Sequence, residues 1–333
     1  MKVLAFAGAA FVSAALAAPA QGALECGDTV TGDRKLKHDL VDCPDRGLYI
    51  QDDGVTLDMN GHEIRGAGDF GIDMMSAKNV TIKNGAIRNG IDTGLVAVDA
   101  DKLTLNNLDI SNSGNRGVHV TNSNGVTIKK TVVRKSSNDA FFFAQLNNAT
   151  ATDIAVAKGD GTGFDISNVV GLTVEGASVI GDDATSADGI VVTENSEDSE
   201  FTDMEIEDWG GNGLEFDVTG SGNVISDVTS RGNEYGFSVS AGTVKIRRSA
   251  ALANGDDGLL VNGADGVRVT EGRFNGNDDD GIQFSPGTIG AVGDNVANNN
   301  ADTGITLPPS GVIDLGGNSA SGNTNLQCVN LAC

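Results

Sequence analysis

The stretch GLVAVDADKLTLNNLDISNSGNRGVHV, residues 94–120, holds one complete unit of a repeat and the start of the next. It opens with Gly94 and an alternating apolar triplet, and two further short apolar alternations follow at 103–105 and 108–110, before the next glycine, Gly117. Alternation with period two is the pattern of a β-strand, and no run is long enough for a helix. Each unit is therefore predicted to contain three short strands separated by Gly, Asn, Asp and Ser turns.

This unit recurs with a spacing of 22 to 26 residues, and the spacing is usually 23. The residues that head the units are Gly47, Gly71, Gly94, Gly117, Ala140, Gly163, Gly189, Gly213, Gly236, Gly258, Gly281 and Gly304. Three strands in so few residues, without tight hairpins, are best accommodated if each unit forms one turn of a coil. Equivalent strands of successive units then pair in parallel, about 4.8 Å apart. The sequence thus predicts an all-β fold, a single right-handed parallel β-helix of about twelve coils.

Composition agrees with a turn-rich solenoid and excludes several other classes of protein. The chain has 46 Gly and 30 Asn among 333 residues, but only 5 Pro. Its 39% of hydrophobic residues is too high for a disordered acidic chain, and its glycine lacks the period of collagen. The formal net charge of −24 argues against nucleic acid as a partner, because binding phosphates needs a basic surface.

The two ends of the chain indicate export. Residues 1–22 combine Lys2, an apolar run and small residues, which is the pattern of a secretory signal peptide. No later segment is apolar enough to be a transmembrane span, so we expect a secreted, periplasmic or cell-surface protein. Four cysteines occur only near the ends, and an even number in an exported protein indicates disulfides. Of three possible pairings, Cys26–Cys43 with Cys328–Cys333 is the simplest.

A solenoid needs closed ends, and the cysteines lie where caps are required. We therefore divide the mature chain into an N-terminal cap (23–46), the β-helix repeats (47–323) and a C-terminal tail (324–333).

Several stretches resemble exported right-handed parallel β-helix repeat proteins of the pectate-lyase-like superfamily. These stretches are Cys26-Gly27-Asp28-Thr29-Val30, Asp39-Leu40-Val41-Asp42-Cys43, Val55-Thr56-Leu57-Asp58-Met59-Asn60-Gly61-His62-Glu63-Ile64 and the ending from Asn318 to Cys333. The resemblance covers the whole mature chain and implies a pectate-lyase-like β-helix. It implies less about chemistry, because this fold carries lyases, hydrolases, epimerases, adhesins and binding proteins.

The repeat places one group of candidate catalytic residues together. His119 and Asp165 fall in one outward column of the first strand, two coils or about 9.6 Å apart. Arg116 and Asp139 lie on the adjacent turn, and Phe142 lies between the two coils. A histidine with carboxylates and a cation could perform acid/base chemistry on a sugar. Alternatively, His119 is a solvent-facing strand residue and Asp139 a turn residue.

Three aromatic or acidic residues are candidates for contacting a glycan. Phe142 and Glu215 belong to the outward column of the first strand, and Trp209 follows an acidic run that begins at Glu194. An exposed tryptophan could stack on a sugar ring, so we expect these three residues to contact ligand.

A second group of residues is acidic and could bind Ca²⁺. Asp256 and Asp257 precede one glycine, Asp279 and Asp280 precede the next, and Asp302 follows one coil later. Stacked carboxylates suit a hard cation that prefers oxygen ligands. The same residues are also suited to solvated turns, so Ca²⁺ is a possible cofactor and no other is indicated.

Complete catalytic signatures are missing. Asn277 to Ile282 and Asp188-Gly189-Ile190 resemble the core motif of polygalacturonase-type hydrolases, but the Gly-His-Gly and Arg-Ile-Lys elements of those enzymes are absent. A column of threonines on the second strand resembles the flat face of ice-binding solenoids. Its members are Thr56, Thr81, Thr104, Thr127, Thr150 and Thr173. The column two residues on is charged and irregular, so the β-propensity of exposed threonine explains this pattern better.

We therefore expect a protein that binds or organises extracellular or envelope polysaccharide without catalysis. The net charge disfavours polyuronates and favours neutral or cation-bridged glycans. The first alternative is a polysaccharide lyase, C5-epimerase or glycoside hydrolase that uses His119, Asp139, Asp165 and Arg116. The second is a purely structural surface protein.

Overall fold

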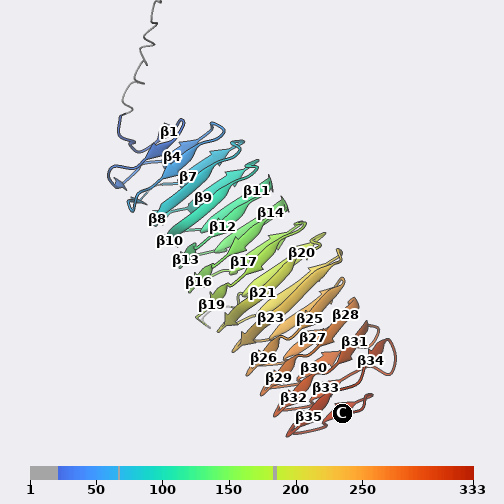
Figure 1. Cartoon of the computed structure of the whole chain (residues 1–333). Coiled ribbons are helices and arrows are strands. Elements are labelled where there is room, and N and C mark those ends of the chain that lie inside the picture. Colours follow the sequence, from blue (N-terminus) through green and yellow to red (C-terminus); the bar gives the residue numbers. More distant parts are fainter. Residues whose placement is uncertain (1–21, 67, 183–185) are drawn as a thin grey trace, which may run out of the picture.

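The computed structural model describes residues 22–66, 68–182 and 186–333, and the predicted signal peptide lies almost entirely outside them. The chain winds into a rod of stacked turns, and its sequence runs steadily from one end to the other (Figure 1). Every strand pairing is parallel and joins a strand to its equivalent one turn away. No helix that could span a membrane is found in the described part of the chain.

Sheet A stacks the strands that follow the repeated glycines. Its fourteen strands are β1 (Asp28–Val30), β4 (Arg46–Ile50), β7 (Phe70–Met75), β9 (Thr93–Val98), β11 (Val118–Asn124), β14 (Phe141–Asn147), β17 (Phe164–Ser167), β20 (Ile190–Glu194), β22 (Leu214–Val218), β24 (Phe237–Ala241), β27 (Leu259–Val261), β30 (Ile282–Phe284), β33 (Ile305–Thr306) and β36 (Cys328–Val329).

Sheet B carries the second and third strands of each turn. In some turns these two strands form one longer strand that runs through the bend between them. Its N-terminal members are β2 (Arg34–Lys35), β3 (Leu40–Val41), β5 (Thr56–Asp58), β6 (Glu63–Arg65), β8 (Thr81–Ile91), β10 (Thr104–Ser113), β12 (Thr127–Lys129), β13 (Val132–Arg134), β15 (Thr150–Thr152), β16 (Ala155–Ala157), β18 (Thr173–Glu175) and β19 (Ser178–Ile180). Its C-terminal members are β21 (Glu200–Glu207), β23 (Asn223–Arg231), β25 (Val244–Arg247), β26 (Ala250–Leu252), β28 (Asp265–Thr270), β29 (Arg273–Asn275), β31 (Ile289–Gly293), β32 (Val296–Asn298), β34 (Val312–Asp314) and β35 (Ser319–Ser321).

The predicted all-β parallel solenoid is confirmed. It has about 13 turns of roughly 23 residues, slightly more than the glycine-headed units indicate. The difference arises at the ends, where β1 and β36 extend sheet A beyond the repeated glycines. The predicted threonine column is in register, as in the pairing of Thr104 with Thr127.

The alternation within each strand builds the core. In β11, Val118 and Val120 are fully buried, whereas His119 between them is half-buried and faces outward. The glycine before the strand is required by close packing: a Cβ on Gly117 would lie 2.3 Å from Cγ1 of Val133. Side chains thus fill the interior from three sides, and the outward positions of sheet A lie at the surface.

Both disulfides form as in the simplest of the predicted pairings. Cys26 bonds Cys43 with 5.3 Å between their Cα atoms, and Cys328 bonds Cys333 with 6.3 Å. Each disulfide lies at one end of the solenoid, where a cross-link stabilises the turn that has a neighbour on only one side.

Candidate functional site

The outward residues of sheet A form one continuous column. Parallel pairing places His119 beside Phe142, Phe142 beside Asp165, and Val191 beside Glu215. Each of these side chains is half-buried. The column combines aromatic, apolar and acidic groups, and it is flanked by the turn that precedes each strand.

Arg116 organises the centre of this face. Its guanidinium carbon lies 3.7 Å from the centre of the Phe142 ring, and its Nε donates to Oδ2 of Asp139 at 2.9 Å. Asp139 is buried, so the ion pair is partly shielded from water. His119 packs edge-on against the same ring, with 4.9 Å between the ring centres. The structure therefore brings Arg116, His119, Asp139 and Phe142 into one cluster, as the sequence predicts.

The imidazole of His119 is tuned toward its neutral form. Burial lowers the pKa of His119, the charge of Arg116 lowers it further, and Asp139 opposes both. No side chain or backbone group of the described residues makes a hydrogen bond to this imidazole. A histidine that acts as general base is usually oriented by a partner, and the described residues give His119 none.

Asp165 extends the cluster by one strand. It pairs with Phe142 across β14 and β17, on the side of Phe142 opposite to His119. Burial raises the pKa of Asp165, the nearby Asp139 raises it further, and Arg116 counteracts them.

Asp188 and Glu215 form a pair of carboxyl groups farther along the same face, which the repeat pattern does not predict. The backbone N–H of Asn212 donates to Oδ1 of Asp188, and its side-chain amide donates to Oε2 of Glu215 at 3.0 Å. Burial raises the pKa of Asp188 to about 6, although the Asn212 hydrogen bond lowers it. The useful sequence signal is that Asp188 and Asn212 occupy the same position before Gly189 and Gly213.

The five acidic candidates for Ca²⁺ do lie together. Their carboxylate oxygens form two groups within 4.8 Å, one of Asp256, Asp257 and Asp279 and the other of Asp279, Asp280 and Asp302. Asp257 and Asp280 are buried, and their Oδ1 atoms accept the backbone N–H groups of Asp280 and Thr303 at 2.9 and 2.8 Å. Asp279 belongs to both groups and would be the shared ligand. Carboxylate oxygens at this spacing fit a hard cation.

The expectation for Trp209 is wrong. Its side chain is only 2% exposed, so it cannot stack on a sugar. Its Nε1 donates to the carbonyl of Val179 at 3.1 Å, and its ring fills the space beside Gly163, Gly181 and Gly189. These glycines leave room for an indole inside the solenoid, and an acidic run before a tryptophan does not reveal that room.

Comparison with known proteins identifies the architecture. A family model described as a right handed beta helix region matches residues 37–179 and 188–331. The chain belongs to this right-handed β-helix family. Its resemblance to pectate-lyase-like β-helix proteins is also supported by solved structures. No curated protein matches the chain by sequence.

Three solved structures illustrate what this β-helix chain is similar to. A point mutant of the periplasmic alginate epimerase AlgG has a TM-score of 0.70 at 12% identity, over 87% of this chain and 77% of that one. The A-module of the Azotobacter vinelandii mannuronan C-5 epimerase AlgE6 has a TM-score of 0.53 at 14% identity, over 91% and 90%. Pectate lyase Pel9A has a TM-score of 0.51 at 14% identity, over 79% and 69%. At such identities the likeness is one of fold.

Proposed function

We propose that the outer face of sheet A binds a polysaccharide without turning it over, in an exported protein. The observation that carries this proposal is the cluster of Arg116, His119 and Phe142. An aromatic edge next to fixed polar groups is the usual means of holding a sugar chain. The column continues on both sides of the cluster, so an extended polymer can contact several turns at once.

The arrangement of the polar groups supports binding more than catalysis. Arg116 already uses its Nε on Asp139 and covers one face of Phe142, so it serves as a fixed element of the surface. The imidazole of His119 has no orienting partner among the described residues. The solved structures of similar fold come from polysaccharide-active enzymes by their titles, and this favours polysaccharide as the ligand class.

Charge favours a neutral glycan at this face. Asp165 and Glu215 line the column, and the chain has no Lys or Arg between residues 159 and 230. A polyuronate would meet like charge along this stretch, at distances shorter than the Debye length.

A glycan array combined with product detection tests the proposal. The wild type is expected to bind a neutral polysaccharide and to release neither reducing ends nor unsaturated sugars. Arg116→Gln should weaken binding about tenfold, because it removes a charge-assisted donor and the cover of Phe142. Arg268→Gln makes the same charge change at an exposed position on β28 and should bind like the wild type. Equal affinity of both variants, or binding to no glycan, would overturn the proposal.

A second candidate function is favoured by Asp188. Asp188 has a pKa of about 6, and Asn212 links it to the carboxyl group of Glu215. Two such carboxyl groups could act as the acid and the base in glycoside cleavage. In that case glycan turnover would be detected and would be lost in Asp188→Asn. Its rate would decline as the pH rises through about 6, because Asp188 would lose the proton that it donates. Turnover that survives Asp188→Asn but is lost in His119→Ala would instead assign catalysis to the Arg116 cluster.

A further inference from the structure

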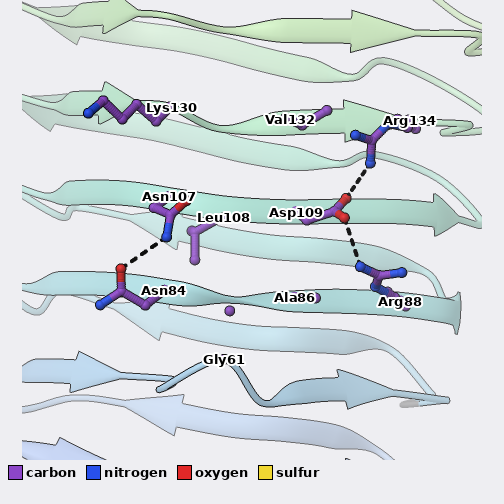
Figure 2. A pocket seen from close by; sticks show the side chains of 11 residues that line it. Gly61, Asn84, Ala86, Arg88, Asn107, Leu108, Asp109, Lys130, Val132 and Arg134 are labelled. Atoms are coloured by element: carbon purple, nitrogen blue, oxygen red, sulfur yellow. Dashed lines mark hydrogen bonds and ion pairs between the residues drawn. The ribbon is translucent and has the colours of Figure 1, made fainter.

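A cavity of about 450 Å³ lies on sheet B, away from the outward column of sheet A. Its polar lining comes from β8, β10 and β13 and the bends within them (Figure 2). The polar residues that line it are Asn84, Arg88, Asn107, Asp109, Lys130 and Arg134. Its size is in the range of sites that hold small molecules or a short stretch of a polymer.

The cavity is built by the bend between the second and third strands of each turn. Asn84, Asn107 and Lys130 occupy equivalent positions there with φ of 59°, 57° and 48°. This left-handed backbone turns the chain, and asparagine adopts it more readily than most residues. The side-chain amide of Asn107 donates to Oδ1 of Asn84 at 3.1 Å, so the bends of successive turns are also linked (Figure 2).

Two arginines share a single carboxylate on one wall of the cavity. Arg88 donates to Oδ2 of Asp109 at 2.7 Å, and Arg134 donates to Oδ1 at 2.6 Å (Figure 2). Each guanidinium has five N–H donors, and these bonds use one from each. The buried Nε of Arg88 has no hydrogen-bond partner and lies 3.7 Å from Oε2 of Glu63. This Nε is not accessible to a ligand, but the other guanidinium N–H groups of Arg88 and Arg134 remain as donors of this wall.

The lysine on the other wall has no acidic partner. Lys130 is exposed, and no carboxylate of the described residues lies within ion-pair distance of it. Lys83 and Lys129, which immediately precede Asn84 and Lys130, likewise form no ion pair with any residue that the structure describes. Among the cavity-lining residues, three cations face one carboxylate, a local excess of positive charge in a chain of net charge −24.

The cavities at this bend differ in charge along the rod. A second cavity at the same bend, several turns farther along the rod, is lined by Asp203, Glu205 and Asp227 and by no Lys or Arg. An anionic ligand would thus be attracted to the first cavity and repelled from the second.

We propose that this basic cavity binds the anionic group of an acidic polysaccharide, the carboxylate of a uronic acid or the sulfate of a sulfated sugar. Arg88 and Arg134 offer planar donors that suit either group, Lys130 adds a mobile charge, and the amides of Asn84 and Asn107 can contact sugar hydroxyls. The site is separate from the Arg116 cluster, so it stands even if the sheet A face binds no glycan.

Lys130→Asn is the discriminating variant. It removes one charge while installing the residue that occupies the same bend in the two preceding turns, so the backbone is preserved. Lys102→Asn is the matched control: Lys102 also has a left-handed backbone (φ 55°), is exposed, and has Asn79 in the equivalent position one turn earlier. The two variants have the same net charge.

The probes are oligogalacturonate, dextran sulfate and uncharged dextran, measured by calorimetry. At about 0.1 M salt, at least one of the two acidic probes should bind the wild type. Binding should weaken strongly at about 1 M salt, because a Debye length of about 3 Å screens the attraction between the charges. Lys130→Asn should weaken binding roughly fivefold, and Lys102→Asn should leave it unchanged. Preference for one acidic probe identifies the group as carboxylate or sulfate.

Three results would overturn the proposal: equal affinity of the two variants, equal binding of uncharged dextran, or no binding of either acidic probe by the wild type. Loss of neutral-glycan binding in Arg116→Gln without any effect on the acidic probes would show that the two sites are independent.

Discussion

The backbone N–H of Trp209 donates to Oδ1 of Asn233 at 2.9 Å. Trp209 therefore lies at the head of a buried ladder of asparagines. In this ladder the backbone N–H of Asn254 donates to Asn277, that of Asn277 to Asn300, and that of Asn300 to Asn323, each at 2.8 to 3.1 Å. The tryptophan takes the place that asparagine occupies in the following turns, and its ring fills a wider part of the interior.

Trp209→Ala is expected to lower the free energy of unfolding by about 3–5 kcal/mol, because it leaves a large cavity beside Gly163 and Gly189. Chemical denaturation followed by circular dichroism measures the change. Phe142→Ala, which truncates a half-buried aromatic residue on the outer face, should cost clearly less. Equal and small losses in both variants would contradict the buried position of Trp209.

Asn277→Ala should cost on the order of 3 kcal/mol, because several buried polar groups would lose their partner at once. Oδ1 of Asn277 accepts both the backbone and the side-chain N–H groups of Asn254, and its own amide donates to Asn300. Asn262→Ala removes an exposed asparagine and should stay within about 0.5 kcal/mol of the wild type. Thermal unfolding of the two variants side by side is sufficient, and equal melting temperatures would argue against a stabilising ladder.

The sequence was sufficient to predict the strands and their outward positions. A period of 23 residues fixes which residues pair, and alternation fixes which of them face out, so the placing of His119 beside Phe142 follows from counting. The twelve repeated units also predicted nearly all of the turns. The end turns were not counted because Gln327 replaces the glycine before β36, and because Gly27 before β1 lies only 20 residues from Gly47, outside the regular spacing.

Side chains in turns could not be predicted in the same way. Trp209 follows Asp208, whose left-handed backbone (φ 58°) redirects the next side chain into the interior. The asparagine ladder arises from the same geometry, so the high Asn content has a structural cause that periodicity alone does not reveal. The link between Asp188 and Glu215 was missed because Asn212 connects them through a backbone N–H as well as a side chain.

Stability should fall as the pH rises from about 4 to 7, and Asp257→Asn should reduce this fall. Burial raises the pKa of Asp257 from its ordinary 3.8 to about 7, although the N–H of Asp280 lowers it. The folded chain thus binds this proton more tightly than the unfolded chain, and the stabilisation is lost as the pH rises through 7. We expect Asp257→Asn to be more stable than the wild type at pH 8 by on the order of 2 kcal/mol. The exposed Asp278→Asn is the control, and an identical pH dependence in all three proteins would refute this role of Asp257.

Calcium should stabilise the protein through the two groups that share Asp279. At pH 8 the carboxyl groups are ionised, and Ca²⁺ would relieve their mutual repulsion. If the affinity is that of extracellular modules, about 10 mM Ca²⁺ should add roughly 1–3 kcal/mol to the unfolding free energy. The gain should disappear in Asp279→Asn and persist in Asp278→Asn, which changes the charge equally at the adjacent exposed position. If Ca²⁺ does not change the melting temperature of the wild type, these aspartates bind no Ca²⁺ and serve only as turn residues.

Two substitutions that flank His119 should move its pKa in opposite directions. Burial is the main cause of the lowered pKa, and Arg116 and Asp139 act on it with opposite sign. Arg116→Gln removes a repelling charge and should raise the pKa of His119, whereas Asp139→Asn removes an attracting charge and should lower it further. Titration by NMR measures both shifts. If both substitutions shift the pKa of His119 the same way, the two substitutions act mainly by changing the burial of the imidazole, and the ion pair of Arg116 and Asp139 does not set the charge of this face.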